Sequence, residues 1–107
     1  MNTIDFFKAL SDETRLRCLS LLVNKGELCV CELTYALNLS QPKISHHLSK
    51  LRKAQLVCDR KEGLWIYYRI NNELSSWFIE ILEATAKGIE NDKPFVTDIQ
   101  TLAAMPE

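Results

Sequence analysis

Apolar residues recur at every third or fourth position along much of the first half of the chain. This spacing matches the 3.6-residue period of an α-helix with one buried face. It predicts helices over Ile4–Leu10, from about Asp12, over about Val30–Leu37 and from Ser40 onward. In the fourth of these, Ile44, Leu48 and Leu51 form the side expected to face the core.

Residues that favour helix ends set the limits of these helices. Ser11 is predicted to cap the second helix, because a hydroxyl oxygen accepts a hydrogen bond from a free backbone N–H of the first turn. Gly26 marks the end of that helix, and Ser40 with Pro42 opens the fourth. Because only a tight turn separates the third and fourth helices, the pattern predicts a helix-turn-helix.

The period changes to strand-like alternation after Leu56. Strands are predicted over Val57–Lys61 and Leu64–Ile70, joined at Glu62 and Gly63. A long helix is expected over about 73–91, and residues 94–107 form a C-terminal tail beyond Pro94. The expected fold is mainly α with a small β-hairpin, a winged helix-turn-helix of about five helices and a two-stranded wing in one domain over residues 1–93.

Charge is unevenly distributed along the chain. Positions 43–61 contain six Lys and Arg residues and one Asp, whereas the whole chain has 13 basic and 14 acidic residues. Such a basic block favours a surface for an anionic polymer, and the alternative is a solvated helix face that happens to be basic. The predicted helix-turn-helix favours double-stranded DNA as this polymer, with the N-terminal part of the fourth helix in the major groove. The residues predicted to contact DNA are Gln41, Lys43, Ser45, His46, His47, Lys50, Arg60 and Lys61.

The remaining composition excludes several classes of protein. No apolar run approaches the roughly 20 residues that a membrane span requires, so no membrane partner is expected. The first residues, MNTIDFFKAL, lack the basic start of a secretory signal, which favours a cytoplasmic location. The four cysteines are then expected to be reduced.

The first and last predicted helices have more apolar residues than one side of a small core needs. A helix-turn-helix protein usually binds two half-sites about one helical turn apart, which favours a two-fold homodimer. The residues predicted to form the dimer interface are Phe6, Phe7, Leu10, Trp77, Phe78, Ile81 and Leu82.

Two thiols, Cys29 and Cys31, occur at the start of the third helix, and we call them the thiol pair. A helix N-terminus stabilises anions, so the pKa values of both thiols are expected to be lowered. In a regular helix, residues two apart point about 200° from each other, so joint binding of one ion would require a distorted helix start. The alternative is two small buried residues without a ligand.

Four segments of the sequence indicate a protein family. They are LSDETRLRCLSLL, GELCVCEL, LNLSQPKISHHLSKLRKAQLV and KEGLWIYYRI. Their order and spacing over about residues 6–90 resemble the ArsR/SmtB family of winged-helix repressors, in particular its arsenical-resistance branch. The resemblance implies a homodimer that leaves its operator when As(III) or Sb(III), an inducer and not a catalytic cofactor, binds. It implies that Cys29 and Cys31 are the inducer ligands.

The chain differs from the arsenic-binding pattern at one position. Thr34 stands where that pattern has a further Cys, so the third ligand could come from Cys18, Cys58, an exogenous thiol or solvent oxygen. The related cadmium- or lead-sensing branch uses N-terminal cysteines, and residues 1–10 contain none. The zinc-sensing branch uses histidines of the last helix, and residues 73–107 contain none.

Two other functions use the same thiols. A redox sensor on the same scaffold would oxidise the thiol pair, although a disulfide between residues two apart is strained. A thiol enzyme is disfavoured, because the chain has no C-x-x-C motif and only three glycines to build a cofactor loop.

Overall fold

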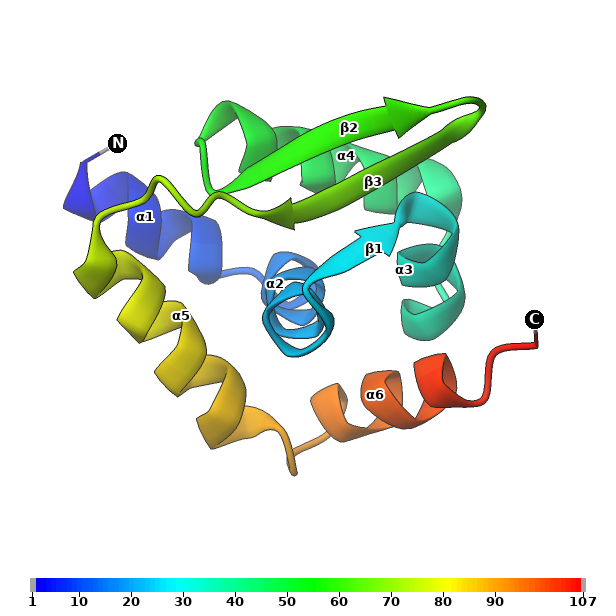
Figure 1. Ribbon diagram of the computed structural model, residues 1–107. Helices are drawn as coiled ribbons and strands as arrows, with labels where there is room; N and C mark the ends of the chain where they lie inside the picture. Colours follow the sequence, from blue (N-terminus) through cyan, green and yellow to red (C-terminus); the bar gives the residue numbers. More distant parts are fainter. Residues whose placement is uncertain (1, 107) are drawn as a thin grey trace.

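The computed structural model describes residues 2–106, which form six helices and a three-stranded sheet (Figure 1). The elements are α1 (Thr3–Leu10), α2 (Glu13–Lys25), β1 (Glu27–Cys29), α3 (Val30–Leu37), α4 (Gln41–Lys53), β2 (Val57–Glu62), β3 (Trp65–Ile70), α5 (Ser76–Ile89) and α6 (Phe95–Ala103). None of these helices combines the length and apolar character needed to cross a membrane.

The predicted helix-turn-helix and hairpin are confirmed. Helix α3 ends at Asn38, whose left-handed φ of 54° turns the chain toward Ser40, and Ser40 accepts a hydrogen bond from the Lys43 backbone N–H at 3.4 Å. Strands β2 and β3 then pair from Val57 opposite Ile70 to Glu62 opposite Trp65. The fold is a winged helix-turn-helix.

Strand β1 extends the predicted hairpin into a sheet with the order β1-β3-β2. Its three residues pair antiparallel with β3, so that Cys29 lies opposite Tyr67. A strand of three residues is too short to show alternation, so the sequence pattern predicts no strand there. As a result, the wing shares a hydrogen-bonded sheet with the first residue of the thiol pair.

The core lies around α2, which Figure 1 shows end-on between α5, the sheet and α3. Leu19, Leu21 and Leu22 of α2 are almost completely buried there. Helix α4 contributes the three apolar residues expected from its spacing, Ile44, Leu48 and Leu51, each with no exposed surface. Burial of such side chains contributes about 1.5–3 kcal/mol each, so this packing fixes α4 relative to α2.

Two sequence-based helix limits need correction. Asp12 caps α2 by accepting a hydrogen bond from the Arg15 backbone N–H at 3.0 Å, whereas Ser11 ends α1 and donates its hydroxyl to the Lys8 carbonyl. The long fifth helix begins later than expected, since Ser75 is its N-cap.

The C-terminal tail contains a helix that packs on the helix-turn-helix. Helix α6 lies against α3 and α2, and its Asp98 carboxylate is bound in a bidentate ion pair by Arg17 of α2, at 2.7 and 2.8 Å. The Asp98 side chain is only 2% exposed. Arg17 also donates to the carbonyl of Leu37 at 3.0 Å, so this contact joins α2, the end of α3 and α6.

Candidate metalloid site and nucleic-acid interface

The thiol pair lies at the junction between β1 and α3. Cys29 is both the last residue of β1 and the N-cap of α3, with an extended backbone at φ −69° and ψ 151°. Its Sγ accepts a hydrogen bond from the Cys31 backbone N–H at 3.4 Å. The Glu32 carboxylate accepts one from the Cys29 backbone N–H at 2.8 Å, which completes a capping box.

This position makes the two sulfur atoms converge. The distance from Cys31 Sγ to Cys29 Sγ is 2.7 Å. The expectation that joint binding requires a distorted helix start was therefore wrong, because Cys29 lies outside the helix and its side chain need not follow the helical rotation of about 100° per residue. Two convergent thiols have the chemistry and the spacing to bind one soft ion together.

Burial outweighs the helix N-terminus in setting the protonation of Cys31. Burial, together with the neighbouring Cys29, raises the pKa of the Cys31 thiol to about 11. The lowered pKa expected for this thiol was wrong, since desolvation disfavours the thiolate and the capping carboxylate of Glu32 adds repulsion. The raised pKa keeps Cys31 in the thiol form at neutral pH.

A pocket of about 490 Å³ opens beside the thiol pair, and we call it the thiol pocket. Most of its wall comes from the start of α3 with Cys29, the first part of α4 and the wing. Met105, after α6, completes the wall. The lining residues are Cys29, Val30, Cys31, Thr34, Tyr35, Gln41, Ser45, Leu64, Trp65, Ile66 and Met105. The Thr34 Oγ1 atom is buried and has no hydrogen-bond partner among the described residues. Sequence analysis did not predict the contributions of the wing and of Met105.

The other two cysteines are separated from the thiol pair. Cys18 has no exposed surface, and burial raises the pKa of its thiol to about 12. Cys58 lies on β2 and lines a different cavity, with Leu74 and Phe78. Within residues 2–106, no three His, Cys, Asp or Glu side chains come together to hold a metal ion. The thiol pair is thus a two-sulfur site.

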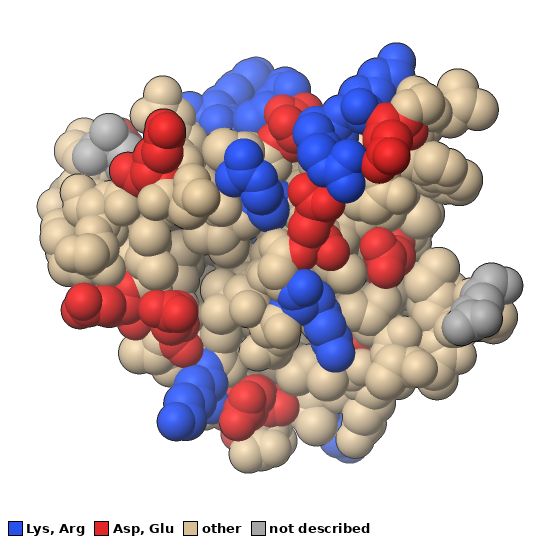
Figure 2. Space-filling model, in the orientation of Figure 1, with Lys and Arg blue, Asp and Glu red and all other residues tan. Residues whose placement is uncertain are grey.

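The exposed side of α4 contains most of the residues predicted to contact DNA. Gln41, Lys43, His46 and Lys50 are exposed, while Ser45 is partly buried at the rim of the thiol pocket. Figure 2 shows Lys and Arg side chains along the upper edge of the molecule, where Figure 1 places α4 and the wing. Lys8 of α1, which the sequence pattern did not single out, lines a groove with Lys50 and Lys53.

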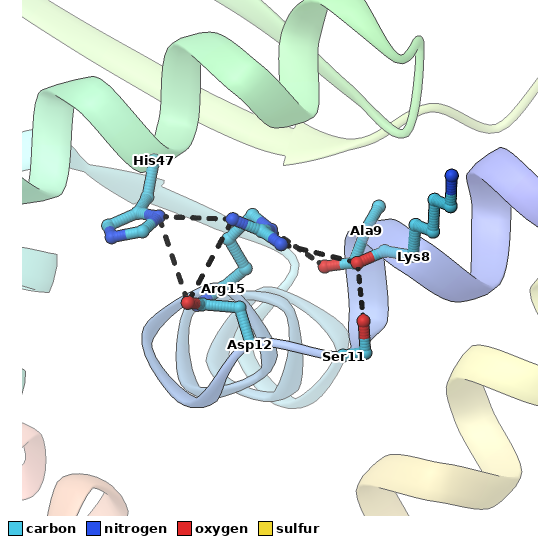
Figure 3. A network of polar contacts seen from close by, with 6 residues as sticks. All are labelled: Lys8, Ala9, Ser11, Asp12, Arg15 and His47. Atoms are coloured by element: carbon cyan, nitrogen blue, oxygen red, sulfur yellow. Dashed lines mark hydrogen bonds and ion pairs between the residues drawn. The ribbon is translucent and has the colours of Figure 1, made fainter.

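His47 does not belong to that exposed side. Its ring points toward α2, where Nδ1 lies 3.5 Å from Arg15 Nη1 and 3.7 Å from Asp12 Oδ2 (Figure 3). Arg15 also donates to the backbone carbonyls of Lys8 and Ala9 in α1. Burial lowers the pKa of His47. The residue joins α4 to α1 and α2 and is a poor candidate for contacting DNA.

Arg60 is also held by protein groups. Its guanidinium binds the Glu27 carboxylate at 2.7 Å and that of Glu62 at 2.8 Å, and it lies 4.5 Å from the centre of the Tyr67 ring. Lys61 is exposed and makes no ion pair with any described residue. Of these two wing residues, Lys61 is the better candidate for a phosphate contact, because the Arg60 charge is already paired with two carboxylates.

The residues expected at a dimer interface divide into two groups. Phe6, Phe78 and Leu82 are at most 7% exposed and belong to the core, while Leu10 and Ile81 pack against it. Phe7 and Trp77 are 45% and 44% exposed, and neighbouring Ile4 is 63% exposed. Close ring packing accounts for the burial of Phe78, whose ring centre lies 4.3 Å from that of Phe6 and 4.0 Å from that of Trp77. Three exposed apolar residues of α1 and α5 remain, Ile4, Phe7 and Trp77, and we call them together the exposed apolar patch.

Comparisons with known proteins agree with this architecture. Residues 12–58 match the family described as "Bacterial regulatory protein, arsR family". The chain is 58% identical to the arsenic resistance transcriptional regulator ArsR2 of Pseudomonas putida, over 76% of this chain and 70% of that protein. It is 50% identical to the arsenical resistance operon repressor of Escherichia coli K12, over 75% and 68% of the two chains. The solved structure of the AntR antimony-specific transcriptional repressor superposes with a TM-score of 0.68 at 31% identity, covering 81% of this chain and 76% of that one.

Proposed function

The chain belongs to the ArsR family of bacterial regulatory proteins, and on that premise we propose that it is a dimeric, metalloid-responsive repressor. The dimer holds operator DNA and releases it when As(III) or Sb(III) binds Cys29 and Cys31. The protein is a regulator and not an enzyme, and it acts in the cytoplasm, where operator DNA lies. The names of the arsenical and antimony repressors that it resembles support this choice of inducer.

The observation that carries the proposal is the shared wall of the thiol pocket. Cys29 and Cys31 line it together with Gln41 and Ser45, which lie in the first part of α4. The N-terminal part of a recognition helix is the part that contacts bases in the major groove. A ligand held by the thiol pair therefore occupies space beside the DNA-contacting end of α4.

The sheet offers a second connection between the thiol pair and the DNA surface. Cys29 lies opposite Tyr67 of β3, and Tyr67 lies opposite Arg60 of β2. The Arg60 guanidinium reaches back across β3 to Glu27 of β1. Strand β1 is joined to the wing by backbone pairing with β3 and by the ion pair between Glu27 and Arg60. Movement of Cys29 on ligand binding therefore displaces the wing as well as α4.

The exposed apolar patch and the exposed side of α4 support operator binding by a dimer. A second copy covering Ile4, Phe7 and Trp77 would place two α4 helices for two half-sites. In this proposal Gln41, Lys43, Ser45 and His46 contact bases or nearby phosphates, while Lys50 and Lys61 bind phosphates.

Replacement of the thiol pair tests the inducer assignment. Arsenite is expected to release wild-type protein from operator DNA, measured by fluorescence anisotropy, and to leave the Cys29→Ser/Cys31→Ser variant bound. Serine preserves helix capping at position 29, so operator affinity without arsenite should change by less than about threefold. Cys58→Ser is the matched control and should respond as wild type. Release that survives the double substitution would falsify the assignment.

The short distance between the two sulfur atoms also suits a redox sensor on the same scaffold. The two functions are separated by adding hydrogen peroxide without metalloid. A metalloid-responsive repressor stays on the operator under mild peroxide, whereas a redox sensor dissociates and loses two free thiols per chain.

A further inference from the structure

Protein thiols supply two of the three bonds that a trivalent metalloid can form in this pocket. As(III) prefers sulfur over oxygen ligands, as soft ions do. Cys18 is sealed in the core and Cys58 faces another cavity, so neither reaches the thiol pair in this fold. The described cysteines thus leave the third coordination position to another ligand.

The thiol pocket has the chemical character of a site for a small organic group. Val30, Leu64, Trp65, Ile66 and Met105 provide apolar surface, and none of the lining residues is charged. Leu64, Trp65 and Ile66 are 94%, 55% and 40% exposed, which leaves apolar surface of the wing uncovered beside the thiols.

Polar groups in the pocket would fix the orientation of such a group. The buried hydroxyl of Thr34 lacks a partner among the described residues, and Gln41 and Ser45 stand at the rim. An apolar wall with a few hydrogen-bonding groups is the usual composition of a small-molecule site.

We propose that the third ligand of the bound metalloid is a small neutral monothiol from solution, whose carbon chain lies in the thiol pocket. The inference rests on the proposed function. Arsenous acid, As(OH)3, exchanges its three As–O bonds for As–S bonds to Cys29, Cys31 and the monothiol. The three thiol protons leave with the three hydroxyl groups as water. No electrons are transferred, so no oxidant or reductant is needed.

The proposal is tested by adding a monothiol to protein kept reduced with tris(2-carboxyethyl)phosphine, a phosphine that has no thiol. With 2-mercaptoethanol present, the arsenite concentration that releases half of the operator should fall by about tenfold, as expected when a further ligand binds the same state. Native mass spectrometry should detect one arsenic and one 2-mercaptoethanol per subunit. Anionic 3-mercaptopropionate should have a smaller effect, because the pocket offers no basic side chain.

Thr34→Cys provides a variant that no longer needs the external ligand. Thr34 lines the same pocket one helical turn after Cys31, so a sulfur there can supply the third bond. The variant should release operator at low arsenite without 2-mercaptoethanol, and its native complex should lack the monothiol. Thr97→Cys is the matched control, since Thr97 is exposed on α6 and should leave the monothiol requirement unchanged.

The outcomes separate this inference from the proposed function. Wild-type release that requires Cys29 and Cys31 but is unaffected by 2-mercaptoethanol, with arsenic alone in the native complex, overturns the inference and leaves the function standing. If arsenite releases no operator with or without the monothiol, both the function and the inference are wrong.

Discussion

The Sγ atom of Cys29 has two roles at one position of the chain. It caps α3 by accepting the Cys31 backbone N–H, and in the proposed function it binds the inducer. Because it stands at the end of β1, its side chain can turn toward Cys31 while the backbone of α3 stays regular. Binding therefore changes the hydrogen bonding of the helix start without first having to unwind it.

The protonation of Cys31 can be measured by its reaction rate. Alkylation by iodoacetamide follows the thiolate population. Since the pKa of Cys31 is raised to about 11, its rate in the folded protein should keep rising about tenfold per pH unit from pH 8 to pH 10. In urea, where burial is lost, the rate should begin to level off near pH 9. Peptide fragmentation distinguishes Cys31 from Cys29, and a plateau near pH 7 in the folded protein would contradict the assigned shift.

At the level of elements, the ion pair between Arg17 and Asp98 fastens α6 to the helix-turn-helix. Asp98→Ala leaves the Arg17 guanidinium, whose side chain is 12% exposed, without its counter-ion. Loss of one partner of a largely buried pair costs about 3 kcal/mol. Urea unfolding should record that loss in the free energy of unfolding. Asp92→Ala changes an exposed carboxylate after α5 and should cost less than about 0.5 kcal/mol. Equal effects of the two variants would mean that α6 is not held by this contact.

The elements that sequence analysis predicted are those with a complete local pattern. Ile44, Leu48 and Leu51 set the buried side of α4. Ser40 caps α4 with its hydroxyl, and Gly26 ends α2 with a positive φ of 88°. Strand β1 has three residues, fewer than are needed to show a period. Helix α6 is short, and its fastening depends on two residues 81 positions apart in the chain.

The same distinction holds for the site. The resemblance of four segments to the ArsR/SmtB family, and not the thiol pair alone, implied that Cys29 and Cys31 are inducer ligands. The convergence of their side chains depends on β1 ending at Cys29. His47 shares the polar side of its helix with His46, and only the position of Asp12 and Arg15 on α2 shows that it points inward. The contribution of Trp65 and Ile66 to the thiol pocket depends on how the wing folds over α3.

For the whole molecule, the exposed patch of Ile4, Phe7 and Trp77 predicts the oligomeric state. Trp77→Glu places a charge in the centre of a proposed apolar interface and should convert the dimer to a monomer in sedimentation velocity, with a loss of operator affinity. Leu64→Glu alters an exposed apolar residue at the tip of the wing and should remain dimeric. A dimeric Trp77→Glu variant would place the interface elsewhere.

The distribution of charge predicts how operator binding depends on salt. Removal of one phosphate contact lowers the slope of log affinity against log salt concentration by about 0.9, so Lys50→Gln, present twice in a dimer, should lower it by about 1.8. The measurement is a series of operator titrations between 50 and 200 mM salt, a range of about one half-decade. Lys87→Gln, on α5, should leave the slope unchanged. An unchanged slope for Lys50→Gln removes this residue from the DNA surface.

The thiol pocket has Cys29 and Cys31 on one wall and Gln41 and Ser45 on another. Under the proposed function, inducer and operator oppose each other through this shared space, and linkage makes the opposition reciprocal. Bound DNA must then lower the affinity of the protein for arsenite by the same factor by which bound arsenite lowers its affinity for DNA. The arsenite concentration that induces a gene then depends partly on the affinity of the repressor for that gene's operator. Promoters with weak operators would open at low exposure and those with strong operators only at high exposure, so one sensor could grade a response among several genes.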